Sequence, residues 1–249
     1  MVLDALLAPL ARELIYPRRG TRVAADDSMH ELDVAGTVLR GWVMNPGRDR
    51  VLLYFGGNGE RLDLWREVVA RRFPDHTTYL MSYRGYGASD GQPGQRALSD
   101  DAVALVDHVN ERHRGPSVDV IGRSLGSGVA VHVATQRLID HVVLVTPFDS
   151  LVATASDLFP GLPIAWLIED HWDSASVAAE LTAPVLVVRA ARDEIVRPQR
   201  TDALIAALSD PVVVSFPDAD HNTISDNPGY WTAISSFLDG PGPVIRPQA

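Results

Sequence analysis

The residues best suited to covalent chemistry lie in a short glycine-rich stretch, GRSLG at residues 122–126. The stretch follows an apolar run at 118–121 and precedes a helical pattern that extends to about Gln136. A serine between glycines at a strand-to-helix turn is typical of a nucleophile elbow, in which a tight turn exposes the serine hydroxyl. This context predicts Ser124 as a nucleophile and the Leu125 N–H as a donor to a developing oxyanion. A purely structural Gly-Ser turn is the alternative.

A serine nucleophile needs a general base, and in an elbow of this type the acid and then the histidine follow the serine in the chain. His221 fits, because it lies late in the chain between a strand-like run and a helical pattern. Asp193 directly follows the strand-like run APVLVVRA and is the predicted acid, whereas Glu194 is interpreted as a solvated loop charge. Asp149, in the sequence TPFDS, is the rival for the acid, and His171 is the rival for the base.

A second glycine-rich stretch, FGGNGE at residues 55–60, follows an earlier strand-like run. The second donor of an oxyanion hole comes from such a loop, so the Asn58 N–H is the predicted donor. An ordinary turn and a phosphate-binding loop are the alternatives. The phosphate loop is disfavoured because the sequence contains no G-x-x-x-x-G-K-S/T pattern and no lysine.

Composition excludes several other kinds of site. The absence of cysteine rules out disulfides, thiolate zinc sites and a cysteine nucleophile. No H-E-x-x-H or similar spacing links the histidines, so neither a metal site nor a cofactor is predicted. The formal net charge of −10 argues against a nucleic-acid partner, which would require clustered positive charge. A small-molecule substrate is therefore expected.

The elements that must position these residues follow an α/β pattern in a single domain, residues 1–249. Apolar runs alternate with longer helical segments, which predicts a mainly parallel central sheet with helices on both faces. Upstream, residues 29–46 alternate in polarity around a turn at Ala35 and Gly36, which predicts an antiparallel hairpin at one edge. The apolar runs are RVLLYF, TTYLMSY, SVDVIG, HVVLVTP, APVLVVRA and PVVVSFP.

Taken together, YFGGNGE, SYRGYGASDG, GRSLGSG, TPFDSL, ARDEIVRP and DADHNTI resemble, in form and order, motifs of the α/β-hydrolase superfamily. The resemblance covers most of residues 37–238 and is closest to small single-domain serine hydrolases, which include esterases and depalmitoylating thioesterases. It implies a triad of Ser124, Asp193 and His221. Backbone donors at Asn58 and Leu125 are implied as well. One departure is that relatives usually carry His-Gly where this chain has Gly-Gly at 56–57.

The implied reaction is hydrolysis of a carboxylic ester of small to medium acyl length through an acyl-enzyme. Residues 148–180 predict a small cap of one or two short helices, and Phe159 and Trp166 are candidates for the wall of a shallow acyl pocket. The alternative is that these apolar side chains simply cover the sheet edge. The alternative functions are an acyl-protein or lipid thioesterase, an amidase or peptidase, and a non-catalytic binding module.

The first residues predict neither a signal peptide nor a transmembrane helix, because Asp4, Arg12 and Glu13 interrupt a short apolar stretch. A cytoplasmic protein is therefore expected. Leucines at helical spacing within residues 1–15 predict a packed helix and leave open a contact with a membrane surface. Residues 240–249 predict a loose tail, and the sequence sets no oligomeric state.

Overall fold

The computed structural model of the chain describes residue 13, residues 15–113, residue 115 and residues 117–240. The leucine pattern of the first residues and the tail beyond residue 240 lie almost wholly outside this part of the chain. Within the described residues, no helix is both long enough and apolar enough to cross a lipid bilayer.

The described residues build one eight-stranded sheet with the order β1-β2-β4-β3-β5-β6-β7-β8. The pairs β1–β2 and β2–β4 are antiparallel, and the other neighbouring strands are parallel, so the predicted hairpin and parallel sheet are confirmed. The strands are β1 (His30–Val34), β2 (Thr37–Met44), β3 (Arg50–Phe55), β4 (His76–Met81), β5 (Ser117–Arg123), β6 (His141–Val145), β7 (Val185–Ala190) and β8 (Val212–Phe216).

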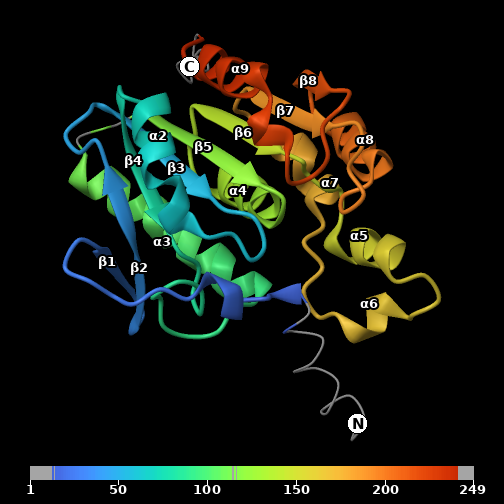
Figure 1. Ribbon diagram of the computed structural model, residues 1–249, viewed down its shortest axis with the longest axis horizontal. Helices are drawn as coiled ribbons and strands as arrows, with labels where there is room; N and C mark the ends of the chain where they lie inside the picture. Colours follow the sequence, from blue (N-terminus) through green and yellow to red (C-terminus); the bar gives the residue numbers. More distant parts are fainter. Residues whose placement is uncertain (1–12, 14, 114, 116, 241–249) are drawn as a thin grey trace, which may run out of the picture.

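Helices cover both faces of the sheet (Figure 1). Alternate side chains of one strand therefore enter different cores: Leu53 of β3 packs with α3 and α4, and Leu52 packs with α2 and α9. Double coverage explains why the central strands are buried on both faces and mostly apolar. The principal helices are α2 (Arg66–Arg72), α3 (Gln95–Arg112), α4 (Leu125–Gln136), α8 (Pro198–Ala207) and α9 (Pro228–Leu238).

The segment predicted as a cap, residues 148–180, contains α5 (Leu151–Leu158), α6 (Ile164–Leu167) and α7 (Ser174–Val177). Figure 1 shows α5 and α6 together at one side of the molecule, below α8, and Arg200 of α8 pairs with Asp157 of α5. The segment leaves the sheet at the carboxyl end of β6 and returns through α7 to the amino end of β7, and its α5 and α6 residues lie with Ser124 at the carboxyl edge of the parallel strands. This is the edge at which ligands bind in open α/β sheets.

The turn from β5 into α4 depends on a close approach between backbones. A Cβ added to Gly126 would lie 2.0 Å from the Phe55 carbonyl oxygen, and one added to Gly122 would lie 2.3 Å from the Gly126 carbonyl oxygen. Between them, Ser124 adopts a φ of +50°, a conformation that is uncommon for residues other than glycine. The two glycines let α4 start directly against β3 and β5.

The Gly126→Ala substitution should therefore lower the free energy of unfolding by at least ~2 kcal/mol, because backbone must shift to admit the methyl group. Gly229→Ala is the matched control, since its Cβ would meet only the Phe216 ring at an ordinary 3.5 Å in the first turn of α9. The control should be neutral or stabilising by up to ~1 kcal/mol. Urea unfolding of both variants measures the difference, and equal stabilities would refute the close-approach argument.

Candidate active site

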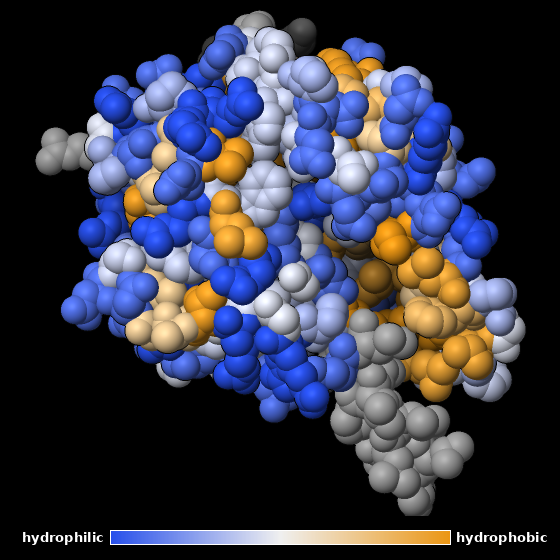
Figure 2. Space-filling view, viewed as in Figure 1, coloured by the Kyte–Doolittle hydropathy of each residue, from blue (hydrophilic) through white to orange (hydrophobic). Residues whose placement is uncertain are grey.

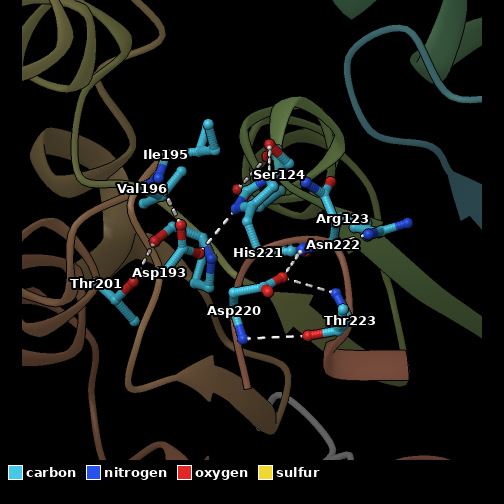
Figure 3. A network of polar contacts seen from close by, with 12 residues as sticks. Arg123, Ser124, Asp193, Ile195, Val196, Thr201, Asp220, His221, Asn222 and Thr223 are labelled. Atoms are coloured by element: carbon cyan, nitrogen blue, oxygen red, sulfur yellow. Dashed lines mark hydrogen bonds and ion pairs between the residues drawn. The ribbon is translucent and has the colours of Figure 1, made fainter. Parts of the chain in front are cut away.

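Loops that follow three parallel strands bring Ser124, His221 and Asp193 together (Figure 3). The Ser124 hydroxyl donates a hydrogen bond to His221 Nε2 over 3.0 Å. The His221 Nδ1–H in turn donates to Asp193 Oδ2 over 2.7 Å. A hydroxyl, an imidazole and a carboxylate in this order form the relay that lets a histidine take a proton from serine.

The carboxylate of Asp193 is held by backbone as well as by His221. Its Oδ1 accepts hydrogen bonds from the N–H groups of Ile195 and Val196, over 2.9 and 2.8 Å. The residue is only 4% exposed, so these charge-assisted bonds replace the water that the carboxylate loses. They leave Oδ2 free to face the imidazole.

The loop that carries His221 is stabilised by its neighbour Asp220. The Asp220 carboxylate accepts hydrogen bonds from the N–H groups of Asn222 and Thr223, over 2.8 and 2.9 Å. The bond from the Thr223 N–H, followed by that from the Asn222 N–H, lowers the pKa of Asp220 below its usual value. The ionised side chain thus closes a tight turn around the histidine (Figure 3).

The rival residues of the sequence analysis lie elsewhere. Asp149 Oδ2 pairs with Arg200 over 3.1 Å, and Asp149 Oδ1 accepts from the Ser150 N–H over 2.8 Å. His171 is exposed to solvent. Neither residue joins the hydrogen-bond relay that ends at Ser124.

The two predicted backbone donors lie beside the serine. Asn58 and Leu125 both line the same cavity as Ser124, and a Cβ added to Gly57 would lie 3.7 Å from Ser124 Cβ. The Asn58 side chain is fixed, because it donates to the Ile15 carbonyl and accepts from the Tyr86 hydroxyl. In the described part of the chain, neither the Asn58 N–H nor the Leu125 N–H has a hydrogen-bond acceptor.

An apolar cavity of about 570 Å³ opens beside Ser124. Figure 2 shows a hollow bordered by hydrophobic side chains at the side of the molecule that carries α5 and α6. Apart from Asn58, Ser124 and Thr154, the side chains that line the cavity are apolar. The cavity is larger than the shallow pocket expected from the sequence. The face of α5 that lines it consists of Leu151, Thr154, Ala155 and Leu158, which have helical spacing.

The structure corrects one predicted pocket residue. Phe159 lines the cavity, but Trp166 does not and is 91% exposed. The reason is the periodicity of the single turn α6: Ile164 and Leu167 share the face toward the cavity, and Trp166 lies on the opposite face.

Sequence reasoning missed two charged residues next to the site, Glu60 and Arg123. Their side chains pair over 2.6 Å and are largely buried. The available signals were an acidic residue directly after GGNG and an arginine inside the elbow sequence. Neither signal shows that Glu60 and Arg123 form an ion pair with each other.

Comparison with known proteins identifies related chains. Residues 50–167 match the family described as alpha/beta hydrolase fold. An uncharacterized protein of Mycobacterium tuberculosis is 34% identical over 239 residues, which cover 92% of this chain and 82% of the relative. Protein bem46 of Schizosaccharomyces pombe is 28% identical over 78% of this chain and 69% of its own length.

Solved structures share the fold at low sequence identity. The esterase Pf2001 of Pyrococcus furiosus superposes with a TM-score of 0.68 and 19% identity, over 87% of this chain and 94% of that structure. An enol-lactonase of Burkholderia xenovorans gives a TM-score of 0.66 at 15% identity, over 85% of this chain and all of that structure.

The hydrogen bond between His221 and Asp193 can be observed directly. In its imidazolium form, the charge-assisted Nδ1–H bond should give a strongly downfield proton resonance. Asp193→Asn should abolish this resonance, and Asp149→Asn should leave it unchanged because Asp149 pairs with Arg200. Proton NMR of histidine-labelled protein makes the comparison; the opposite pattern would transfer the role to Asp149.

Proposed function

Because the chain belongs to the alpha/beta hydrolase family, we propose that it is a serine hydrolase that cleaves carboxylic esters through Ser124, His221 and Asp193. The observation that carries the proposal is the relay of hydrogen bonds, 3.0 Å from Ser124 to His221 and 2.7 Å from His221 to Asp193. The apolar cavity beside the serine supports an acyl substrate.

In the first half of the reaction, Ser124 Oγ attacks the acyl carbon while its proton passes to His221 Nε2. The carbonyl oxygen becomes an oxyanion, which the N–H groups of Asn58 and Leu125 stabilise. When the tetrahedral intermediate collapses, the C–O bond to the alcohol breaks and His221 returns the proton to the leaving oxygen. The acyl group remains on Ser124.

In the second half, His221 takes a proton from water, and the hydroxide oxygen attacks the acyl carbon. Collapse of the second intermediate releases the acid and returns the proton to Ser124. Throughout both halves, Asp193 keeps the Nδ1 proton on the imidazole and stabilises its charged form. The scheme needs no metal and no cofactor.

The cavity indicates which acyl groups this site would take. Its volume of about 570 Å³ lies within the range of pockets that enclose most of a ligand. We therefore expect medium and longer acyl chains, beyond the small to medium range predicted from the sequence. The cap segment, residues 148–180, supplies the walls of the cavity through α5 and α6.

An acyl thioester or lipid-like substrate is the second candidate. The observation that favours it is the partial exposure of cavity residues at the rim, with Leu158, Phe159 and Leu162 between 36% and 56% exposed. An apolar rim continuous with an apolar cavity suits a long acyl chain that enters from an amphiphilic carrier. The same relay would serve this reaction and an amide hydrolase.

Substitution of the nucleophile tests the central proposal. Ser124→Ala should lower kcat for p-nitrophenyl esters by at least ~10³-fold and abolish labelling by a fluorophosphonate. Ser236→Ala, on the exposed side of α9, is the matched control and should leave both unchanged. Retention of labelling in the Ser124 variant would show that another residue is the nucleophile, and absence of labelling in the wild type would favour a binding module.

Chain-length dependence tests the use of the cavity. With p-nitrophenyl esters of two to sixteen carbons, kcat/KM should rise by up to about fourfold for each buried methylene and continue past hexanoyl. Phe159→Ala should flatten this rise, and Trp166→Ala is the control that should preserve it, because Trp166 faces solvent. A wild-type plateau at four to six carbons would exclude the cavity as the acyl site. Parallel thioesters separate the second candidate from the first.

A further inference from the structure

A buried ion pair lies next to the relay without being part of it. Glu60 Oε1 and Arg123 Nη1 are 2.6 Å apart, and their side chains are only 8% and 11% exposed. The residues are 63 positions apart in the chain: Glu60 lies in the loop after β3, and Arg123 is the last residue of β5. Removing two charges from water is costly unless they form a close pair with further hydrogen bonds. The position of this pair beside Ser124 therefore calls for an explanation.

Glu60 holds Gly57 at both of its backbone groups. The Gly57 N–H donates to Glu60 Oε2 over 2.5 Å, and the Gly57 carbonyl accepts from the Glu60 N–H over 3.2 Å. In a trans peptide, the carbonyl of one residue and the N–H of the next point in opposite directions. The Glu60 N–H therefore directs the Asn58 N–H away from Glu60, and the Glu60 carboxylate fixes the preceding peptide through the Gly57 N–H. The Asn58 N–H is the one assigned above to the oxyanion.

The unusual Gly56 makes room for this arrangement. A Cβ at position 56 would lie 3.0 Å from Glu60 Oε2 and 2.8 Å from Leu62 Cδ2. A larger residue at position 56, including the histidine expected from the family resemblance, would require the Leu62 side chain and the Glu60 carboxylate to shift. In this chain, the loop that carries Gly57 and Asn58 is held by the Glu60 carboxylate and not by a side chain at position 56.

A carboxylate near a developing oxyanion would oppose catalysis unless its charge were balanced. Arg123 provides the balance, and its Nη2 also donates to the His221 carbonyl over 3.2 Å. Burial disfavours the charged guanidinium, but the Glu60 carboxylate together with the nearby Tyr54 and Tyr230 more than offsets this and raises the pKa of Arg123 above its usual value. Arg123 therefore stays charged and connects the oxyanion loop to the loop of the base.

We propose that Glu60 and Arg123 are positioning residues: Glu60 aims the Asn58 N–H at the oxyanion, and Arg123 neutralises Glu60 and holds the His221 loop. This role rests on the proposed function, because it requires an oxyanion at Ser124. It assigns a catalytic consequence to two residues that never touch the substrate.

The proposal predicts an order of effects at position 60. Glu60→Gln keeps an oxygen that can accept from the Gly57 N–H, whereas Glu60→Ala removes it, and both leave Arg123 without its carboxylate partner. Glu60→Ala should therefore have a kcat at least ~10-fold below that of Glu60→Gln, with KM within about threefold. Arg123→Met leaves an unbalanced carboxylate and should lose ~10²-fold in kcat. The double variant E60Q/R123M should recover at least ~10-fold over R123M.

The second readout is inhibition by a trifluoromethyl ketone. Ser124 Oγ bonds to its carbonyl carbon, the serine proton passes to His221, and the ketone oxygen becomes the anion. The inhibition constant should rise across the variants in parallel with the loss in kcat/KM, because both report stabilisation of the oxyanion. A role in folding alone would lower the melting temperature without this parallel.

Arg84→Met is the matched control, because Arg84 forms a comparable ion pair with Asp101 of α3. It should leave kcat and ketone inhibition unchanged at temperatures below its melting transition. Equal kcat values for E60A and E60Q, or unchanged ketone inhibition in both, would overturn the proposal, and these two variants decide the matter even if R123M does not fold. Failure of the wild type to hydrolyse esters or to label would instead refute the proposed function.

Discussion

The site depends on one constraint, the sharp turn between β5 and α4. Ser124 adopts a φ of +50° there, and this conformation is held by its neighbours: the Ser124 N–H donates to the Val145 carbonyl over 2.9 Å, and the Ser127 hydroxyl donates to the Ser124 carbonyl over 2.6 Å. The turn points the serine hydroxyl at the carboxyl edge of the sheet. Asp193 and His221 come from loops that reach that same edge. If Ser124 adopted an ordinary conformation, its hydroxyl would no longer lie within hydrogen-bond distance of His221.

The parallel sheet explains why so much of this arrangement could be predicted from the sequence. Parallel strands end at the same edge, so Asp193 after β7 and His221 after β8 must lie near Ser124 after β5. Continuous apolar runs identify the strands because helices bury both of their faces. The outer strand β8 differs, since Val212 and Val213 are 51% and 40% exposed. In β8, the run of valines reflects the preference of β-branched residues for strands more than it reflects burial.

What the sequence could not supply are contacts between residues far apart in the chain and the direction of side chains on very short helices. The apolar content of residues 148–180 predicted a pocket. The size of the cavity, however, depends on how α5 and α6 are placed relative to Ser124. Trp166 is apolar enough for a pocket, but it lies on the surface. In the single helical turn of α6, only one face can point toward the cavity. Likewise, Glu60 and Arg123 each look like ordinary surface charges until the fold buries them together.

A second Asp–His cluster shows that the proposed site depends on where the residues lie in the sheet and not on their types alone. Asp119 on β5 accepts hydrogen bonds from His76 over 3.1 Å and from His141 over 2.7 Å. Burial favours the neutral acid, yet the bonds from His141 and His76 hold the pKa of Asp119 below its usual value. The three residues come from the amino-terminal halves of β4, β5 and β6, at the edge opposite to Ser124. They include the Asp and His residue types of the relay but no serine, and at that edge His76 borders a pocket of about 40 Å³. Their hydrogen bonds therefore join strands, whereas those of Asp193 and His221 end at a hydroxyl that faces an apolar cavity.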